Sequence, residues 1–301
     1  MEKESCYIES AGDRTTVIVE LDPPKEPNLS EYLRGVKELE KAGADTITIA
    51  DNSMSYSRIC NTVVASIIKS ETSFNPLVHI ACRDRNLIGQ QSRFLGLHIL
   101  GLDKVMIVTG DPPRSGDLPQ SKAVFETNSI NLMNKVKGLN DGQFFSGDQM
   151  KSKTVFKIGG AINQGKYGSP SLERIDLKIK AGCRFFLTQP FYSKEMITRF
   201  AESIETYVKD TVIFIGIMPL VSFKNAQFLD QYVSGVNIPS DILSTMAKYK
   251  GDDAKKAGIE IAINLAEYAR RFFKGLYLIT PFMKYDITAE ICSHMKKEVL
   301  L

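Results

Sequence analysis

The chain alternates short apolar segments with longer segments of helical periodicity, and the alternation repeats eight times. The apolar segments are rich in Val, Ile, Phe and Thr and almost continuously hydrophobic, as expected for parallel strands buried on both faces. They span residues 15–20, 45–51, 77–84, 104–111, 154–163, 184–189, 212–218 and 275–280. Each segment is therefore predicted to form one strand of a parallel sheet.

The intervening segments carry apolar residues three or four positions apart, which predicts amphipathic helices. In residues 29–42, for example, Leu29, Val36 and Leu39 fall on one face, and Gly43 follows as a stop signal. Further helices are predicted at residues 59–68, 87–100, 130–139, 172–181, 195–207, 225–232, 241–249, 253–273 and 288–299. The segments at 241–249 and 253–273 are extra helices before the eighth strand.

Eight strand–helix units joined by right-handed crossovers favour an α/β fold, the closed (β/α)8 TIM barrel. An open doubly wound sheet is the main competitor, but it rarely carries so many regular units, and no GxGxxG follows the first strand. The 301 residues suit one barrel, and no low-complexity segment or linker divides them. We predict a single domain over residues 1–301, with residues 1–14 as an N-terminal extension.

Acidic or amide side chains end five of the predicted strands. They are Glu20, Asp51, Asp84, Asp111 and Gln189. All strand ends of such a barrel open onto one face, where active sites are built. The pattern therefore predicts an enzyme with one large pocket.

Composition narrows the class of protein. With 38 basic and 35 acidic residues the net charge is +3, so neither nucleic acid nor an anionic membrane is expected as a partner. The first residues lack an apolar signal segment, and no run of about 18 apolar residues occurs, so no membrane span is expected.

The five cysteines lack paired spacing, which favours reduced thiols and a cytoplasmic location. Three histidines without an HExxH motif or Cys/His pairing predict no metal site.

Two carboxylates are the leading candidates for chemistry. Glu20 leaves a buried strand just before two prolines, which hold it on a stiff, extended exit. Partial burial would raise its pKa and suit it to general-acid catalysis, whereas the alternative is a capping or salt-bridged acid at the rim. Gly110 lets the backbone before Asp111 pass close to a ligand, whereas the alternative for Asp111 is an Asx-turn.

The third predicted strand carries His79 and ends in a charge cluster of Arg83, Asp84 and Arg85. Strand alternation could point His79 into the barrel or away from it, as a ligand contact or as a hydrogen-bonded core residue. The cluster could hold a phosphate, because Arg presents a planar fork, or form an internal ion-pair network.

Other polar and aromatic positions keep two interpretations each. Gln189 offers a donor and an acceptor that could read an amide or pyrimidinone edge. Phe223 could stack on a flat ligand or simply pack. Lys178 is interpreted as a solvated surface lysine unless a phosphate lies near it.

Two long loops are also predicted. The polar segment 111–127 is predicted to be a lid, and residues 140–153 are predicted to form an irregular loop on the opposite face of the barrel.

Six motifs, in order along the chain, resemble the methylenetetrahydrofolate reductase family. They are VELDPPK, TIADNS, LVHIACRDRN, LGLDKVMIVTGDPP, AGCRFFLTQPFY and IGIMPLVSFKNAQFL. The likeness runs from about Thr15 to the C-terminus and is greatest to the reductase half of bacterial bifunctional homocysteine S-methyltransferase/methylenetetrahydrofolate reductases. The methyltransferase half, with its cysteine zinc site, is absent from this sequence.

The resemblance implies a barrel that binds FAD and uses NADH or NADPH to reduce methylenetetrahydrofolate to methyltetrahydrofolate, in one-carbon and methionine metabolism. It implies that Glu20 is the general acid that protonates the folate nitrogen, and that Asp111 lies beside the pyrimidine end of the flavin and favours a cationic iminium. Gln189 would contact folate, and Phe223 would stack on nicotinamide or folate. The implied flavin contacts are Ala50, Asp51, Ser53, His79, Thr109, Gly110, Asp111 and Lys178. A homo-oligomer is expected, and a separate homocysteine methyltransferase is a candidate partner.

Four positions differ from the stand-alone bacterial enzymes of the family. Thr109 replaces an arginine, Ala161 a tyrosine by the flavin, Ser171 an acid at the ribityl or ribose, and Phe282 an arginine near the folate tail. Two alternative functions stay open: a barrel methyltransferase acting on a methyl-folate, which would bind no flavin, and a non-catalytic subunit that only binds a partner enzyme.

Overall fold

The computed structural model describes residues 7–11, 13–165, 168–208, 211–233 and 235–297. Eight parallel strands form a closed barrel in sequence order, and the last strand pairs with the first. The strands are β1 (Thr16–Glu20), β2 (Thr46–Ile49), β3 (Leu77–Ala81), β4 (Lys104–Val108), β5 (Lys157–Ile162), β6 (Cys183–Pro190), β7 (Val212–Ile217) and β8 (Gly275–Ile279). The predicted (β/α)8 barrel is confirmed.

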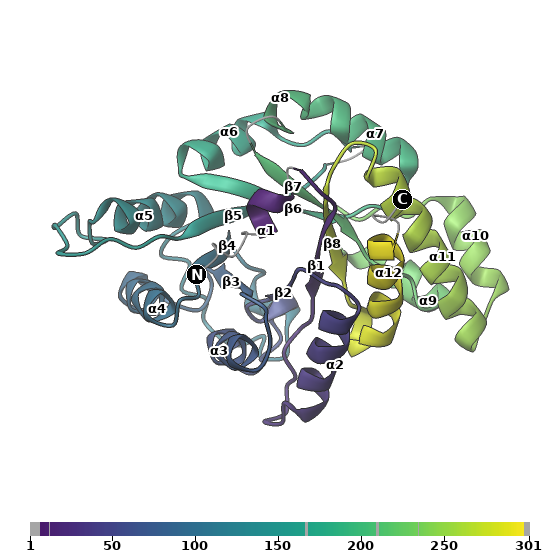
Figure 1. Cartoon of the computed structure of the whole chain (residues 1–301), viewed down its shortest axis with the longest axis horizontal. Coiled ribbons are helices and arrows are strands. Elements are labelled where there is room, and N and C mark those ends of the chain that lie inside the picture. The colour runs from purple at the N-terminus through teal and green to yellow at the C-terminus, as the bar shows by residue number, and fades with distance from the viewer. Residues whose placement is uncertain (1–6, 12, 166–167, 209–210, 234, 298–301) are drawn as a thin grey trace.

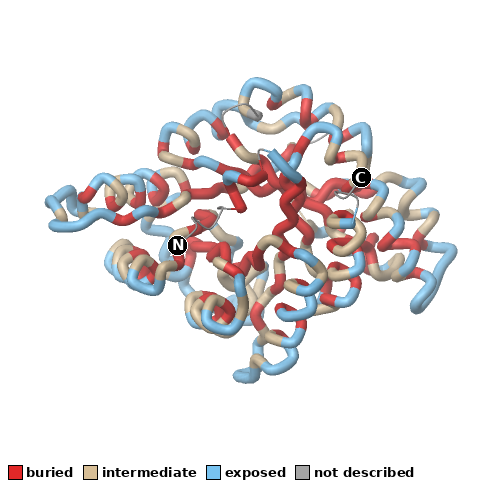
Figure 2. The backbone as a smooth tube through the Cα atoms, in the orientation of Figure 1, coloured by how far each residue is buried: buried red, intermediate tan, exposed pale blue. Residues whose placement is uncertain are grey.

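Helices surround this barrel (Figure 1). They are α2 (Ser30–Lys41), α3 (Asn61–Glu71), α4 (Leu87–Ile99), α5 (Ser129–Asp141), α6 (Leu172–Lys180), α7 (Lys194–Ser203), α8 (Glu205–Val208), α9 (Phe223–Tyr232), α10 (Ser240–Lys248), α11 (Gly251–Ala269) and α12 (Tyr285–Lys297). Buried residues concentrate in the strands and on the helix faces turned toward them (Figure 2). The extra helices before the eighth strand, α10 and α11, are present as predicted.

Several boundaries differ from the prediction by a few residues. For example, β3 and β4 end at Ala81 and Val108, three residues before Asp84 and Asp111. The helix expected over residues 195–207 is interrupted at Ile204, where α7 ends and the short α8 follows. The fifth strand begins at Lys157 and not at Thr154. The Asn140 side chain accepts hydrogen bonds from the Thr154 hydroxyl (2.7 Å) and the Phe156 backbone N–H (2.8 Å), so this segment is bonded to the end of α5.

Alternation along β1 decides which side chains enter the barrel. Val17 and Val19 pack in the cluster beneath the helices, whereas Ile18 lies in a second cluster with Leu77, Phe185 and other residues of the barrel interior. Because successive strand residues point to opposite faces, Glu20 follows Ile18 into the interior, at the end of the strand where the barrel opens.

A short helix closes the other end of the barrel. In α1 (Tyr7–Ser10), Tyr7 and Ile8 are buried in the interior cluster, and Glu9 pairs with Lys157 at the start of β5 (3.0 Å). Figure 1 shows α1 across the centre of the ring of strands. Part of the predicted extension is thus core; residues 1–6 and 12 lie outside the described residues.

Four of the five cysteines, Cys60, Cys82, Cys183 and Cys292, are free thiols, and Cys6 lies outside the described part of the chain. None of the helices in that part combines the length and the apolar character that a bilayer crossing needs.

Candidate active site

Four polar side chains from four adjacent strands meet inside the open end of the barrel. Glu20, at the end of β1, has a side chain 15% exposed and accepts a short hydrogen bond at Oε2 from the Tyr277 hydroxyl on β8. His79 on β3 places Nε2 3.9 Å from the same oxygen, and the Thr48 hydroxyl on β2 lies 2.5 Å from that ring nitrogen. The imidazole of His79 therefore points into the barrel and not away from it.

Burial controls the charge of this cluster. Burial raises the pKa of Glu20 to about 8 and nearby Asp22 adds to the rise, while the Tyr277 hydrogen bond and Arg58 partly oppose it. Burial lowers the pKa of His79 to about 4. At neutral pH the cluster therefore holds a protonated carboxyl beside a neutral imidazole, which is the state that a general acid requires.

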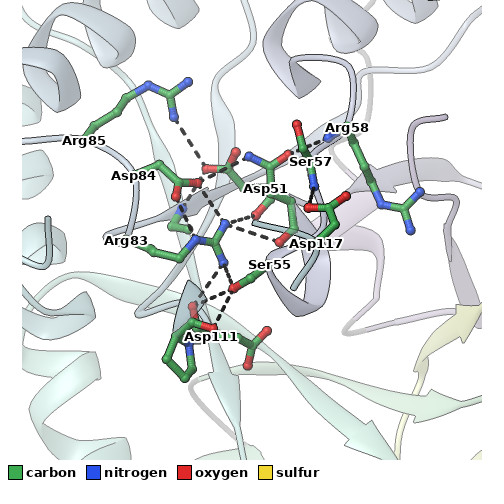
Figure 3. A network of polar contacts seen from close by, with 12 residues as sticks. Asp51, Ser55, Ser57, Arg58, Arg83, Asp84, Arg85, Asp111 and Asp117 are labelled. Atoms are coloured by element: carbon green, nitrogen blue, oxygen red, sulfur yellow. Dashed lines mark hydrogen bonds and ion pairs between the residues drawn. The ribbon is translucent and has the colours of Figure 1, made fainter. Parts of the chain in front are cut away.

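A buried arginine joins the loops that follow β2, β3 and β4 (Figure 3). The Arg83 guanidinium makes a two-pronged ion pair with Asp84 (2.7 and 2.8 Å). It also donates to the Ser55 hydroxyl (3.0 Å) and to the backbone carbonyls of Asp51, Asn52 and Asp111 (3.3 Å each). Since these protein acceptors occupy the fork of Arg83, its cluster forms the internal network that was the alternative to a phosphate site.

The loop after β2 contains three predicted flavin contacts, Ala50, Asp51 and Ser53. The Asp51 carboxylate accepts the Ala81 backbone N–H (2.9 Å) and pairs with Arg93 (2.7 Å), and both charged side chains are 6% exposed. Ser53 donates to Asp22 (2.6 Å), and Ala50 is buried. The Asp51 carboxylate is therefore engaged within the protein.

The same loop holds non-glycine residues in the left-handed region. Asn52, Met54 and Ser55 have φ values of 53°, 51° and 61°. Such backbone is strained for residues with a Cβ and persists only where surrounding contacts fix it. Arg83 supplies two such contacts, because its guanidinium donates hydrogen bonds to the Asn52 carbonyl and to the Ser55 hydroxyl.

Asp111 lies in the loop after β4 and directly follows Gly110, which has a φ of 92°. Its backbone carbonyl accepts the Ser55 hydroxyl (2.8 Å) as well as Arg83. Its carboxylate receives no hydrogen bond from any residue that the structure describes, and the residue is exposed. The Asp111 carboxylate thus has no hydrogen bond of its own within the described structure, although it interacts electrostatically with Arg83.

The rest of that loop is tied to its neighbours. Asp117 accepts the Ser57 backbone N–H (3.0 Å) and pairs with Lys25 (3.2 Å). A Cβ at Gly116 would lie only 1.9 Å from the Ser55 carbonyl oxygen, so the two segments touch. The loop therefore lies against the segments after β1 and β2, and its opening as a lid stays a prediction.

A cavity of about 220 Å³ lies where β4 and β5 end beside α6, and Thr109 and Lys178 both line it. Lys178 is only 8% exposed, donates to the Ala161 carbonyl (2.5 Å) and has its pKa lowered by burial. Interpreting Lys178 as a solvated surface lysine was wrong, because the helix turns it inward toward β5. Ser171 and Arg174 also line the cavity, so hydroxyls and cations form one part of its wall and apolar residues the rest.

Gln189 and Phe223 follow later strands. Gln189 is half-buried near the end of β6, two residues beyond Leu187 of the barrel interior. Phe223 is the first residue of α9; it packs against the core and lines a different cavity, of about 310 Å³, between α9 and α10. Phe223 and Lys178 therefore border separate cavities.

The sequence interpretation missed Tyr277, Thr48 and Arg93. For Tyr277 a signal existed: Gly275, Tyr277 and Ile279 share one face of the eighth strand, and Leu276 and Leu278 share the other. Only the register between β1 and β8 shows that Tyr277 lies below Glu20.

Comparisons with known proteins point to one family. The sequence profile of the family "Methylenetetrahydrofolate reductase" matches residues 8–296. "5,10-methylenetetrahydrofolate reductase" of Pectobacterium carotovorum subsp. carotovorum is 21% identical, covering 86% of this chain and 82% of that protein. "Methylenetetrahydrofolate reductase 1" of Schizosaccharomyces pombe is 21% identical over 67% of this chain, and "Methylenetetrahydrofolate reductase (NADH) 1" of Arabidopsis thaliana is 22% identical over 68%. The matched region covers 32% and 35%, about a third, of these two relatives.

Among solved structures, an uncharacterized protein from Clostridium thermocellum that binds two copies of 5-methyl-5,6,7,8-tetrahydrofolic acid superposes with a TM-score of 0.62. It is 17% identical, and the match covers 96% of each chain. EDTA monooxygenase (EmoA) from Chelativorans sp. BNC1 has a TM-score of 0.57 at 10% identity, with 95% of this chain and 94% of that chain covered. At these identities the superpositions establish the barrel fold alone.

Proposed function

Because the chain belongs to the methylenetetrahydrofolate reductase family, we propose that it reduces methylenetetrahydrofolate to methyltetrahydrofolate with FAD as cofactor and NADH or NADPH as hydride donor. The observation that supports this most directly is the Glu20 carboxyl, buried at the open end of the barrel with its pKa raised to about 8. A carboxyl that keeps its proton at neutral pH can protonate a substrate nitrogen. The same family includes the relative named as NADH-dependent, which favours a nicotinamide donor.

The residues around the β4–β5 cavity fit the polar part of a flavin. Hydroxyls of Thr109, Ser129 and Ser171 suit a ribityl chain, and Arg174 and Lys178 suit phosphate. The carboxylate of Asp51 is engaged by Arg93, so this proposal gives Asp51 a contact through its backbone only. When bound, the flavin supplies the hydride transfer, and the protein supplies orientation and charge.

The residues of the chain have distinct roles in this proposal. Glu20 holds a proton and gives it to the folate nitrogen as the ring that contains the methylene bridge opens. Asp111, whose carboxylate has no hydrogen-bond partner among the described residues, stabilises the cationic iminium that forms. Gln189 reads the polar edge of the pterin, and Phe223, at the start of α9, stacks on a flat ring.

Spectroscopy of the purified protein tests the proposal. We expect a flavin absorption band that bleaches when NADH or NADPH is added without oxygen and that returns when methylenetetrahydrofolate is added, with methyltetrahydrofolate as the product by mass spectrometry. No bleaching with either nicotinamide would reject the proposal. A colourless protein that transfers a methyl group from methyltetrahydrofolate would indicate the methyltransferase alternative, and a folded protein with neither activity the non-catalytic one.

A further inference from the structure

Tyr277 stands below the candidate acid on the neighbouring strand. In the β1–β8 pairing Ile18 faces Tyr277 and Glu20 faces Ile279, so the phenol lies one inward position deeper than the carboxyl. Its ring is 6% exposed and packs in the interior cluster with Ile18 and Phe214. Its hydroxyl donates to Glu20 Oε2, and among the described residues it has no other hydrogen-bond partner.

We propose that Tyr277 is a positioning residue for Glu20: its hydroxyl holds Oε2 against the barrel wall, so that Oε1 carries the transferable proton. This inference rests on the proposed function, because it concerns the proton that the folate nitrogen receives. Within the described part of the chain no residue hydrogen-bonds Oε1, which leaves this oxygen free for a substrate.

The groups facing Glu20 explain why the tyrosine matters. They are Asp22 beyond β1, Tyr32 on α2, Arg58 beyond β2, Thr48, His79 and Tyr277. Burial and Asp22 disfavour the carboxylate, whereas Tyr277 and Arg58 favour it. Of these two, only Tyr277 makes a hydrogen bond with the carboxyl group, so it constrains geometry as well as charge.

The proton balance is simple. The carboxyl O–H bond breaks and an N–H bond forms on folate as the ring C–N bond opens, which leaves Glu20 as a carboxylate. Tyr277 keeps its own proton, because burial and the nearby Glu20 raise its pKa well above the usual value. Its hydrogen bond to the new carboxylate becomes charge-assisted and therefore stronger.

The test replaces the hydroxyl alone, in Tyr277→Phe, with Tyr192→Phe as the matched control. Tyr192 is also buried, and its hydroxyl has no hydrogen-bond partner among the described residues. Infrared titration of the ligand-free protein, with Glu20→Gln to assign the band, follows the Glu20 carboxyl directly. Since the lost hydrogen bond favoured the carboxylate, the titration midpoint should move to higher pH in Tyr277→Phe and stay in place in Tyr192→Phe.

Kinetics supply the second measurement. In Tyr277→Phe the reduction of folate should slow roughly 10- to 100-fold, as expected for a lost hydrogen bond to a charged group, while flavin reduction by the nicotinamide is unchanged. In a plot of the folate-reduction rate against pH, the fall at alkaline pH should move to higher pH together with the infrared titration midpoint.

The outcomes separate this inference from the proposed function. An unmoved infrared midpoint, or equal slowing of both half-reactions, would overturn the role of Tyr277. If the wild-type protein reduces no folate, the proposed function fails; the infrared titration alone then decides whether Tyr277 holds the Glu20 carboxyl, and a moved midpoint supports it.

Discussion

The Glu20 carboxyl is held in its protonated form by the fold, and this has an energetic consequence. Its pKa is about 8 in the folded chain and near the ordinary 4.5 in the unfolded chain. Between these values the unfolded chain loses the proton while the folded chain keeps it, so this group makes folding less favourable as pH rises from 4.5 to 8. Below 4.5 both states are protonated, and the effect vanishes.

Glu20→Gln should therefore stabilise the protein at pH 8 and not at pH 4. We expect the free energy of unfolding to rise by roughly 2–4 kcal/mol at pH 8, since the amide cannot ionise and can still accept the Tyr277 hydrogen bond. Urea unfolding at the two pH values measures it. If Glu20→Gln changed the free energy of unfolding equally at both pH values, burial would not be what keeps the Glu20 carboxyl protonated.

The same substitution should separate the two half-reactions. Flavin reduction by nicotinamide needs no proton from Glu20 and should persist in Glu20→Gln, whereas folate reduction should fall by about 10²- to 10⁴-fold. Stopped-flow absorbance under anaerobic conditions measures each step. Glu26→Gln is the control, because Glu26 is exposed in the loop that follows the same strand. Equal losses in both steps would remove Glu20 from the proton transfer.

Asp111→Asn should affect catalysis without affecting stability. Its carboxylate has no hydrogen-bond partner within the described structure, and the backbone carbonyl that Ser55 and Arg83 hold is unchanged by the substitution. We expect the same Tm, a much slower folate step and nearly normal nicotinamide oxidation, since the lost charge would face the cationic iminium. A normal folate rate would contradict the assignment.

The loop after β4 is placed by its contact with the loop after β2. A Cβ at Gly116 would meet the Ser55 carbonyl, so Gly116→Ala must displace one loop from the other. We expect faster limited proteolysis within residues 111–127 and a slower folate step, because Asp111 belongs to the same loop. Gly96→Ala is the control: nothing lies within 4 Å of a Cβ there, and alanine favours the helix. Equal proteolysis of both variants would show that the loop is not held by this contact.

The elements themselves were largely predictable, because apolar runs and helical spacing are local properties of the sequence. Where side-chain bonds compete with backbone pairing, prediction failed by a few residues. Asn140 bonds the segment before β5, and no local pattern in residues 154–156 announces a partner so far back in the chain.

The candidate site was less predictable, for the same physical reason. The strand-end position of Glu20 is local, and its burial and raised pKa were expected from it. The burial of Lys178, the pairing of Asp51 with Arg93 and the bond from Tyr277 depend on how α6, α4 and β8 pack against other elements. Parallel register and helix orientation decide such contacts, and neither is set by spacing alone.

For the molecule as a whole, the short helix α1 completes the core at the end of the barrel opposite the site. Ile8 is 4% exposed in the interior cluster, so Ile8→Ala should lower the free energy of unfolding by about 2–4 kcal/mol, as for other buried Ile truncations. Ile99→Ala is the control: Ile99 is 84% exposed, so we expect a change below about 0.5 kcal/mol. Chemical denaturation measures both, and equal effects would show that α1 does not belong to the core.

The hydrogen bond between Tyr277 and Glu20 joins residues 257 positions apart, one on the last strand and one on the first. The two residues come together only when β8 takes its place beside β1 and closes the barrel. A fragment that stops before β8 would lack the phenol beside its acid, however many other units had folded. In the proposed mechanism, proton transfer from Glu20 therefore depends on the pairing of β8 with β1 that closes the ring of strands.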